Sequence, residues 1–166
     1  MTRFAILMAV ALALGAPAAH AAWKPLVTPA EAAALIGADA VVIDIRAPEA
    51  FAAGHVAGAV NLPYPAWRGP AENPGALVEG EAVQALLRKA GATPASTVIV
   101  LNEGRDSLDF GAAARVYWTV KSAGISNVTI LNGGLTAWQG AGLALSTIAR
   151  EPAPSAAEFA LSGAWT

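Results

Sequence analysis

The amino-acid sequence predicts an α/β fold of three layers, in which helices cover both faces of a central, mostly parallel sheet of five strands. Two observations lead to this prediction. Short apolar runs rich in β-branched residues alternate with segments of helical periodicity, at the spacing typical of βαβ units. The 166 residues are 55% hydrophobic and 13% charged, which is enough for one domain with a sizeable core.

The expected strands are short apolar runs. The clearest is residues 98–101, whose four apolar residues, three of them β-branched, fit a central strand covered on both faces. Residues 23–27 are expected at an edge of the sheet. The five runs are residues 23–27, 41–45, 60–63, 98–101 and 127–131.

The expected helices follow these strands. Thr28 precedes Pro29, and Glu31 comes three residues after Thr28, which predicts a capping box and a helix that stops near Gly37. A short helix is expected to open near Pro48. The later helices are expected over residues 79–90, from a cap at Ser107 or Asp109 to a stop by Gly124, and from Gly133 to Gly140 or Gly142.

Both ends of the chain differ from the middle. Residues 1–21 have the pattern of a signal peptide, with Arg3 before an apolar run and a small-x-small site that ends at Ala21. We therefore expect cleavage after Ala21, a periplasmic or secreted protein, and no membrane association afterwards. Residues 22–145 would form the domain. Residues 146–166, rich in Pro, Ala and Ser, are expected to be an extended tail packed on the surface.

Composition excludes several kinds of chemistry. The net charge of −2 argues against nucleic-acid binding, which normally needs a basic patch. The chain has no cysteine, so disulfides, thiolate metal sites and cysteine nucleophiles are excluded. Loss of His20 with the signal peptide would leave His55 as the one histidine, so no metal site and no cofactor are predicted.

The candidate pocket is the polar loop that leaves the strand at residues 98–101 and leads into the next helix. Ligands of open α/β sheets bind at this edge, and helix N-termini favour anions. Arg105, with Ser107 and loop N–H groups, could hold a small oxyanion such as thiosulfate, sulfite or sulfate. The alternative is a solvated arginine that pairs with a neighbouring carboxylate. The loop residues are Asn102, Glu103, Gly104, Arg105, Asp106 and Ser107.

Three segments carry a resemblance to a known family. Residues 44–63 read DIRAPEAFAAGHVAGAVNLP, residues 127–138 read NVTILNGGLTAW, and residues 114–118 read ARVYW. With these segments the chain resembles the rhodanese (sulfurtransferase) superfamily over about residues 25–145. It is particularly similar to the non-catalytic domain of thiosulfate and mercaptopyruvate sulfurtransferases. The resemblance implies the rhodanese-like fold.

The same resemblance argues against the family's usual activity. Active members carry sulfur as a persulfide on a cysteine that begins the loop after the central strand, and this position falls on Asn102. An amide side chain is not a nucleophile and forms no persulfide. The resemblance also implies that Asp44, Arg46 and His55 support the fold. Ser107, His55 and Asp44 are of the residue types of a nucleophilic triad, but a framework role is more typical of such positions.

We therefore expect an inactive, exported sulfurtransferase homologue that binds a small sulfur oxyanion or a protein partner in sulfur or redox metabolism. Two alternatives remain: an enzyme that uses non-cysteine chemistry in the same loop, and a subunit that pairs with a catalytic domain. Trp118 and Trp138 are expected to pack on helix faces. Trp67 is expected either to mark a partner contact or to cover the core.

Overall fold

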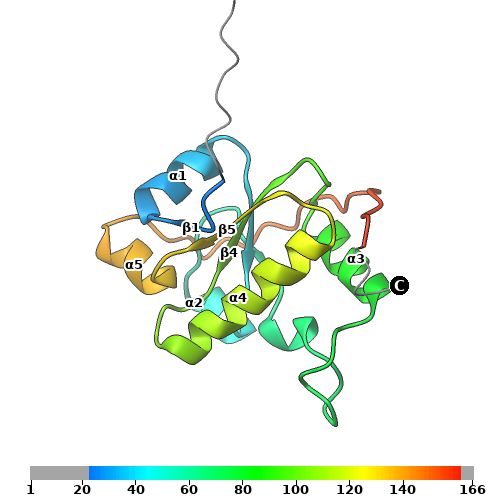
Figure 1. Cartoon of the computed structure of the whole chain (residues 1–166). Coiled ribbons are helices and arrows are strands. Elements are labelled where there is room, and N and C mark those ends of the chain that lie inside the picture. The colour runs from blue at the N-terminus through cyan, green and yellow to red at the C-terminus, as the bar shows by residue number, and fades with distance from the viewer. Residues whose placement is uncertain (1–22, 162–166) are drawn as a thin grey trace, which may run out of the picture.

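A computed structural model describes residues 23–161 and contains a sheet of five parallel strands (Figure 1). The strand order is β1-β5-β4-β2-β3, so β4 is central, and the predicted α/β fold is confirmed. Parallel register between β2 and β4 places Asp44 opposite Leu101, so both strands end at the same edge of the sheet. The strands are β1 (Leu26–Val27), β2 (Val41–Asp44), β3 (Val60–Asn61), β4 (Thr97–Leu101) and β5 (Asn127–Leu131).

The helices form one layer on each face of the sheet (Figure 1). The predicted capping box of α1 is present, because the Thr28 hydroxyl accepts from the Glu31 N–H and the Glu31 carboxylate accepts from the Thr28 N–H. The helices are α1 (Pro29–Gly37), α2 (Pro48–Ala53), the 3₁₀ helix η1 (Tyr64–Trp67), α3 (Gly80–Lys89), α4 (Ser107–Ser122) and α5 (Gly134–Gly140).

Strand β4 divides the core into two parts. Val98 and Val100 point into the cluster formed with η1, α3 and α4, whereas Ile99 and Leu101 point into the cluster formed with α1, α2 and α5. Successive side chains of a strand face opposite sides, so a strand buried on both faces must be apolar throughout. This burial fixes β4 rigidly and therefore fixes where the following loop starts.

The cap of α4 differs from the prediction. Asp106 is the N-cap, and its carboxylate accepts from the N–H groups of Leu108 and Asp109, both at 2.9 Å. Ser107 and Asp109, the predicted caps, already lie in the first turn of the helix. Asp106 has the extended backbone that is typical of a capping residue. Because Asp106 caps the helix, the Asp109 carboxylate is available for a different contact.

The tryptophans differ in how deeply they are buried. Trp67 is fully buried in the α3–α4 cluster, and its Nε1 donates to the carbonyl of Leu62, so it belongs to the core and is not an exposed contact. Trp138 is buried as expected. Trp118, which was expected to pack on a helix face, is 46% exposed and is not part of the core. It lies on the outer side of α4, away from the buried Val116 and Val120.

The segment after α5 is extended and is fixed at several points. Ser146 forms an antiparallel bridge with His55, and the Arg88 side chain donates to the carbonyl of Ala157 at 2.7 Å. Phe159 is buried in the α3–α4 cluster, so this segment completes part of the core. The predicted signal peptide lies outside the described residues. Within residues 23–161, no helix has both the length and the apolar character needed to cross a bilayer.

Candidate functional site

The loop between β4 and α4 is held against the turn that precedes α5. Gly104 has a φ of 86°, and a Cβ at this position would overlap the carbonyl oxygen of Gly133. Only glycine combines this backbone conformation with so close an approach. The first N–H groups of α5 are used here as well, because Leu135 donates to the Asn102 carbonyl at 2.9 Å and Thr136 donates to the Glu103 carbonyl at 3.0 Å. The loop is therefore rigid.

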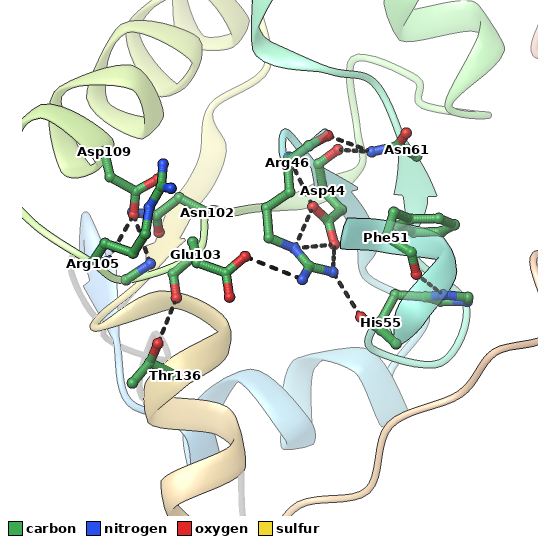
Figure 2. A network of polar contacts seen from close by, with 12 residues as sticks. Asp44, Arg46, Phe51, His55, Asn61, Asn102, Glu103, Arg105, Asp109 and Thr136 are labelled. Atoms are coloured by element: carbon green, nitrogen blue, oxygen red, sulfur yellow. Dashed lines mark hydrogen bonds and ion pairs between the residues drawn. The ribbon is translucent and has the colours of Figure 1, made fainter. Parts of the chain in front are cut away.

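The donors of this loop converge on a carboxylate of the same chain (Figure 2). Asp109 Oδ2 accepts from Asn102 Nδ2 at 2.9 Å, from Gly104 N at 2.6 Å and from Arg105 N at 3.1 Å. Asp109 was not among the predicted site residues. The sequence signal for it was an acidic residue in the first turn of a helix, which indicated only a cap or a dipole contact.

Asn102, the residue at the position implied for the cysteine, is the first residue after β4 and is 2% exposed. Its amide nitrogen faces Asp109, and its buried Oδ1 has no hydrogen-bond partner among the described residues. An amide at this position can donate and accept hydrogen bonds but cannot attack sulfur. The side chain therefore orients the loop and supplies no nucleophile.

Asp44 and Arg46 form a buried ion pair at the end of β2 (Figure 2). Arg46 Nη2 lies 2.8 Å from Asp44 Oδ2 and donates to the Gly54 carbonyl, and its Nη1 lies 3.3 Å from Glu103 Oε2. Burial raises the pKa of the Asp44 carboxyl above its ordinary value, because desolvation outweighs the hydrogen bonds from Arg46. Burial alone would lower the pKa of Arg46, but its bonds to Asp44 and contacts with Glu103 raise it. These groups join β2, α2 and the loop.

His55 lies in the same region but faces away from the loop. Its ring is fully buried and stacks on Phe51 with the ring centroids 3.8 Å apart. Its two ring nitrogens contact the carbonyls of Phe51 and Ile148, at 2.9 and 3.1 Å. The possible triad is not assembled, because these nitrogens are used by backbone, Asp44 is paired with Arg46, and Ser107 lies exposed at the start of α4.

The predicted oxyanion site is therefore only partly formed. Arg105, in the loop, and Ser107, at the start of α4, are exposed, but the N–H groups of Gly104 and Arg105 already donate to Asp109. Glu103, a carboxylate that neighbours Arg105 in the sequence, contacts Arg46 instead. Among residues 23–161, no group of three or more His, Cys, Asp or Glu side chains is placed to hold a metal ion.

An open groove of about 530 Å³ runs beside the loop. It separates the start of α2 and η1 from the start of α4, and much of its wall is apolar. Leu108, on this wall, is 85% exposed. The apolar wall comprises Ile45, Ala47, Pro48, Ala50, Pro63, Tyr64, Pro65, Leu108 and Ala112.

Comparison with known proteins identifies the family. Residues 28–141 match the rhodanese-like domain, and the chain belongs to this family. It is 32% identical over 113 residues to the thiosulfate sulfurtransferase GlpE of Pseudomonas entomophila, covering 68% of this chain and 83% of GlpE. It is 33% identical over 121 residues to a Synechococcus elongatus protein named "Putative thiosulfate sulfurtransferase". That match covers 72% of this chain but only 36% of the Synechococcus protein.

Solved structures show the same fold. The structure of SseA from Escherichia coli, from work on 3-mercaptopyruvate sulfotransferases, superposes with a TM-score of 0.69 at 24% identity. The match covers 84% of this chain and 56% of SseA. The chain thus spans about a third of the Synechococcus relative and little more than half of SseA. The expected rhodanese-like fold and relationship to sulfurtransferases are confirmed, and the absence of cysteine is consistent with inactivity.

Proposed function

We propose that this chain is a non-catalytic rhodanese-fold module that acts by binding a protein partner in sulfur or redox metabolism. One observation carries the proposal: β4 ends in Asn102, a residue that cannot carry sulfur, in a chain without cysteine. The scaffold around this position is nevertheless complete, from the buried Asp44–Arg46 pair to the rigid loop. A fold kept without its nucleophile is consistent with a binding role.

A protein partner is favoured over a small sulfur oxyanion by the loop contacts. The N–H groups that would bind an oxyanion donate to Asp109, and a free anion would have to displace this carboxylate. Beside the loop, the groove and the exposed Leu108 offer an apolar surface of the kind that partners cover. The Synechococcus relative is longer than this chain and is named as a thiosulfate sulfurtransferase, so the partner that we propose is a sulfurtransferase that carries the catalytic cysteine.

Sulfur transfer from thiosulfate to cyanide tests the non-catalytic part. The purified protein is expected to show the same rate as a no-protein control, and Asn102→Ala is expected to change nothing. A rate clearly above the control that Asn102→Ala abolishes would refute this part of the proposal.

Affinity capture from source cells, followed by mass spectrometry, tests the partner. We expect a cysteine-containing rhodanese-family protein that is lost with Leu108→Asp. The matched control is Ile148→Asp, because Ile148 is 81% exposed and does not line the groove. Equal capture by both variants would exclude the groove as the binding surface.

We also propose that the protein is exported and acts in the periplasm. The support is the pattern of residues 1–21, which combines a positive start, an apolar run and a cleavage site at Ala21. Fractionation of cells that produce the full chain is expected to give a periplasmic protein that starts at Ala22. Recovery of the chain in the cytosol with Met1 intact would contradict export.

A further inference from the structure

Asp109 is the centre of the hydrogen bonds in the loop. A single oxygen, Oδ2, accepts from two backbone N–H groups and one side-chain amide, at 2.6, 3.1 and 2.9 Å (Figure 2). Donors that converge on one oxygen from a rigid loop are the arrangement by which proteins bind oxyanions. In this chain the anion is the Asp109 carboxylate, which lies in the first turn of α4. The helix dipole also favours negative charge at that position.

The buried amide of Asn102 is oriented by the same carboxylate. Its Nδ2 donates to Asp109, while Oδ1 is buried without a partner among the described residues. Rotation of the amide by half a turn would place Oδ1 against a carboxylate oxygen, which is unfavourable. Asp109 therefore keeps Nδ2 of Asn102 directed toward the centre of the loop. The loop therefore presents the same three donors whether or not a ligand is near.

A free anion meets two obstacles at this loop. Asp109 is tethered to the chain, so it competes with an effective concentration far above that of a dilute ligand. The approach to the loop is also lined by Glu103 and Asp106, whose charges are opposed by those of Arg46 and Arg105. Like charges placed where a competing ligand would bind are an effective means of rejecting it.

We propose that Asp109 is a built-in anion that closes this loop to small oxyanions and so determines what the pocket rejects. This inference goes beyond the proposed function and does not depend on any partner. It predicts that the donors are competent and that neutralisation of residue 109 alone converts the loop into an oxyanion site.

The test is a titration of the isotope-labelled protein with sodium thiosulfate and sodium sulfate at constant ionic strength, followed by the NMR signals of the Gly104 and Arg105 amides. Wild type is expected to show no saturable shift. Asp109→Ala, which empties the site, is expected to bind at least about tenfold more tightly than wild type. Asp109→Asn retains an uncharged acceptor and is expected to fall between them.

The matched control is Asp106→Asn. It removes the same charge from the same loop but leaves Asp109 in place, and asparagine is as good an N-cap as aspartate. Because Asp106 also lines the approach, a small gain is expected in this control, and a clearly larger gain in both Asp109 variants supports the proposal. If Asp109→Ala does not fold, the comparison of Asp109→Asn with Asp106→Asn decides alone. Equal gain in the control, no gain in any Asp109 variant, or tight binding by wild type would overturn the proposal.

Discussion

The ends of β2 and β4 are neighbours at one edge of the sheet, and a carboxylate is held beside each. Asp44, at the end of β2, is fully buried and pairs with the guanidinium of Arg46. Asp109, beside the end of β4, is partly exposed and accepts from neutral donors in the loop. Removal of Asp44 would leave the buried charge of Arg46 without its main partner, which is costly. The neutral donors around Asp109 could be satisfied by another acceptor, such as water.

The difference separates a part of the framework from a part of the site. Arg46 also donates to the Gly54 carbonyl, so the Asp44–Arg46 pair connects β2 to the segment after α2. The donors around Asp109 connect only the loop to the start of α4. Changes at Asp44 should therefore act on folding, and changes at Asp109 should act mainly on what the loop binds.

The largest effect is expected for Asp44→Ala. It leaves Arg46 buried without its main anion, which typically costs about 3–5 kcal/mol of folding free energy. Urea unfolding followed by tryptophan fluorescence measures the loss. Glu49→Ala, on the exposed side of α2, is the control and should stay within about 0.5 kcal/mol of wild type. A loss at Asp44 no larger than at Glu49 would show that the pair is not part of the framework.

The second effect is expected for Gly104→Ala. The positive φ strains any side chain, and the added Cβ would overlap the Gly133 carbonyl, so we expect a loss of about 2–3 kcal/mol. Gly111→Ala is the matched control, because this helical glycine has open space around it and alanine should stabilise α4 by up to about 1 kcal/mol. Chemical denaturation compares the two variants. If Gly104→Ala is as stable as wild type, the loop is not held as rigidly as the contacts indicate.

The fold was predictable because strong local signals agreed with one another. Residues 98–101 are apolar on both sides, and this pattern specifies a central strand whatever its neighbours are. The strand fixes Asn102 as the first residue of the loop, so the residue in the position implied for the cysteine could be found from the sequence. The expected roles of Arg105 and Ser107 in oxyanion binding stay predictions.

The role of Asp109 could not be predicted because it depends on the path of the loop. The turn at Gly104 brings two N–H groups within reach of that carboxylate. From its position in the sequence alone, Asp109 was a candidate helix cap. The exposure of Trp118 was missed for another reason. Helix α4 carries apolar residues on most of its sides, so periodicity did not show that Trp118 faces outward. Trp67 lies in a segment rich in Pro and Gly that has no periodicity to read.

A smaller effect on stability is expected for Asp109→Ala. Three donors lose their acceptor, but Arg105 is exposed and water can replace part of the contact, so we expect a loss of about 1–2 kcal/mol. The measurement is the same unfolding experiment used for Asp44→Ala, in the same buffer. A loss as large as that of Asp44→Ala would remove the distinction between framework and site.

The smallest effect is expected for Glu103→Gln, at a side-chain contact between the two regions. Glu103 Oε2 lies 3.3 Å from Arg46 Nη1, and the Glu103 side chain is 30% exposed, so solvent screens the pair. We expect the substitution to cost about 0.2–1 kcal/mol of folding free energy. The cost is small because the glutamine amide keeps a hydrogen-bond acceptor and Asp44 still neutralises Arg46. A double-mutant cycle with Asp109→Ala measures whether the regions are coupled. Additive losses would show that they are independent, whereas a coupling energy above about 0.5 kcal/mol would show that Arg46 supports the Asp109 contact through Glu103.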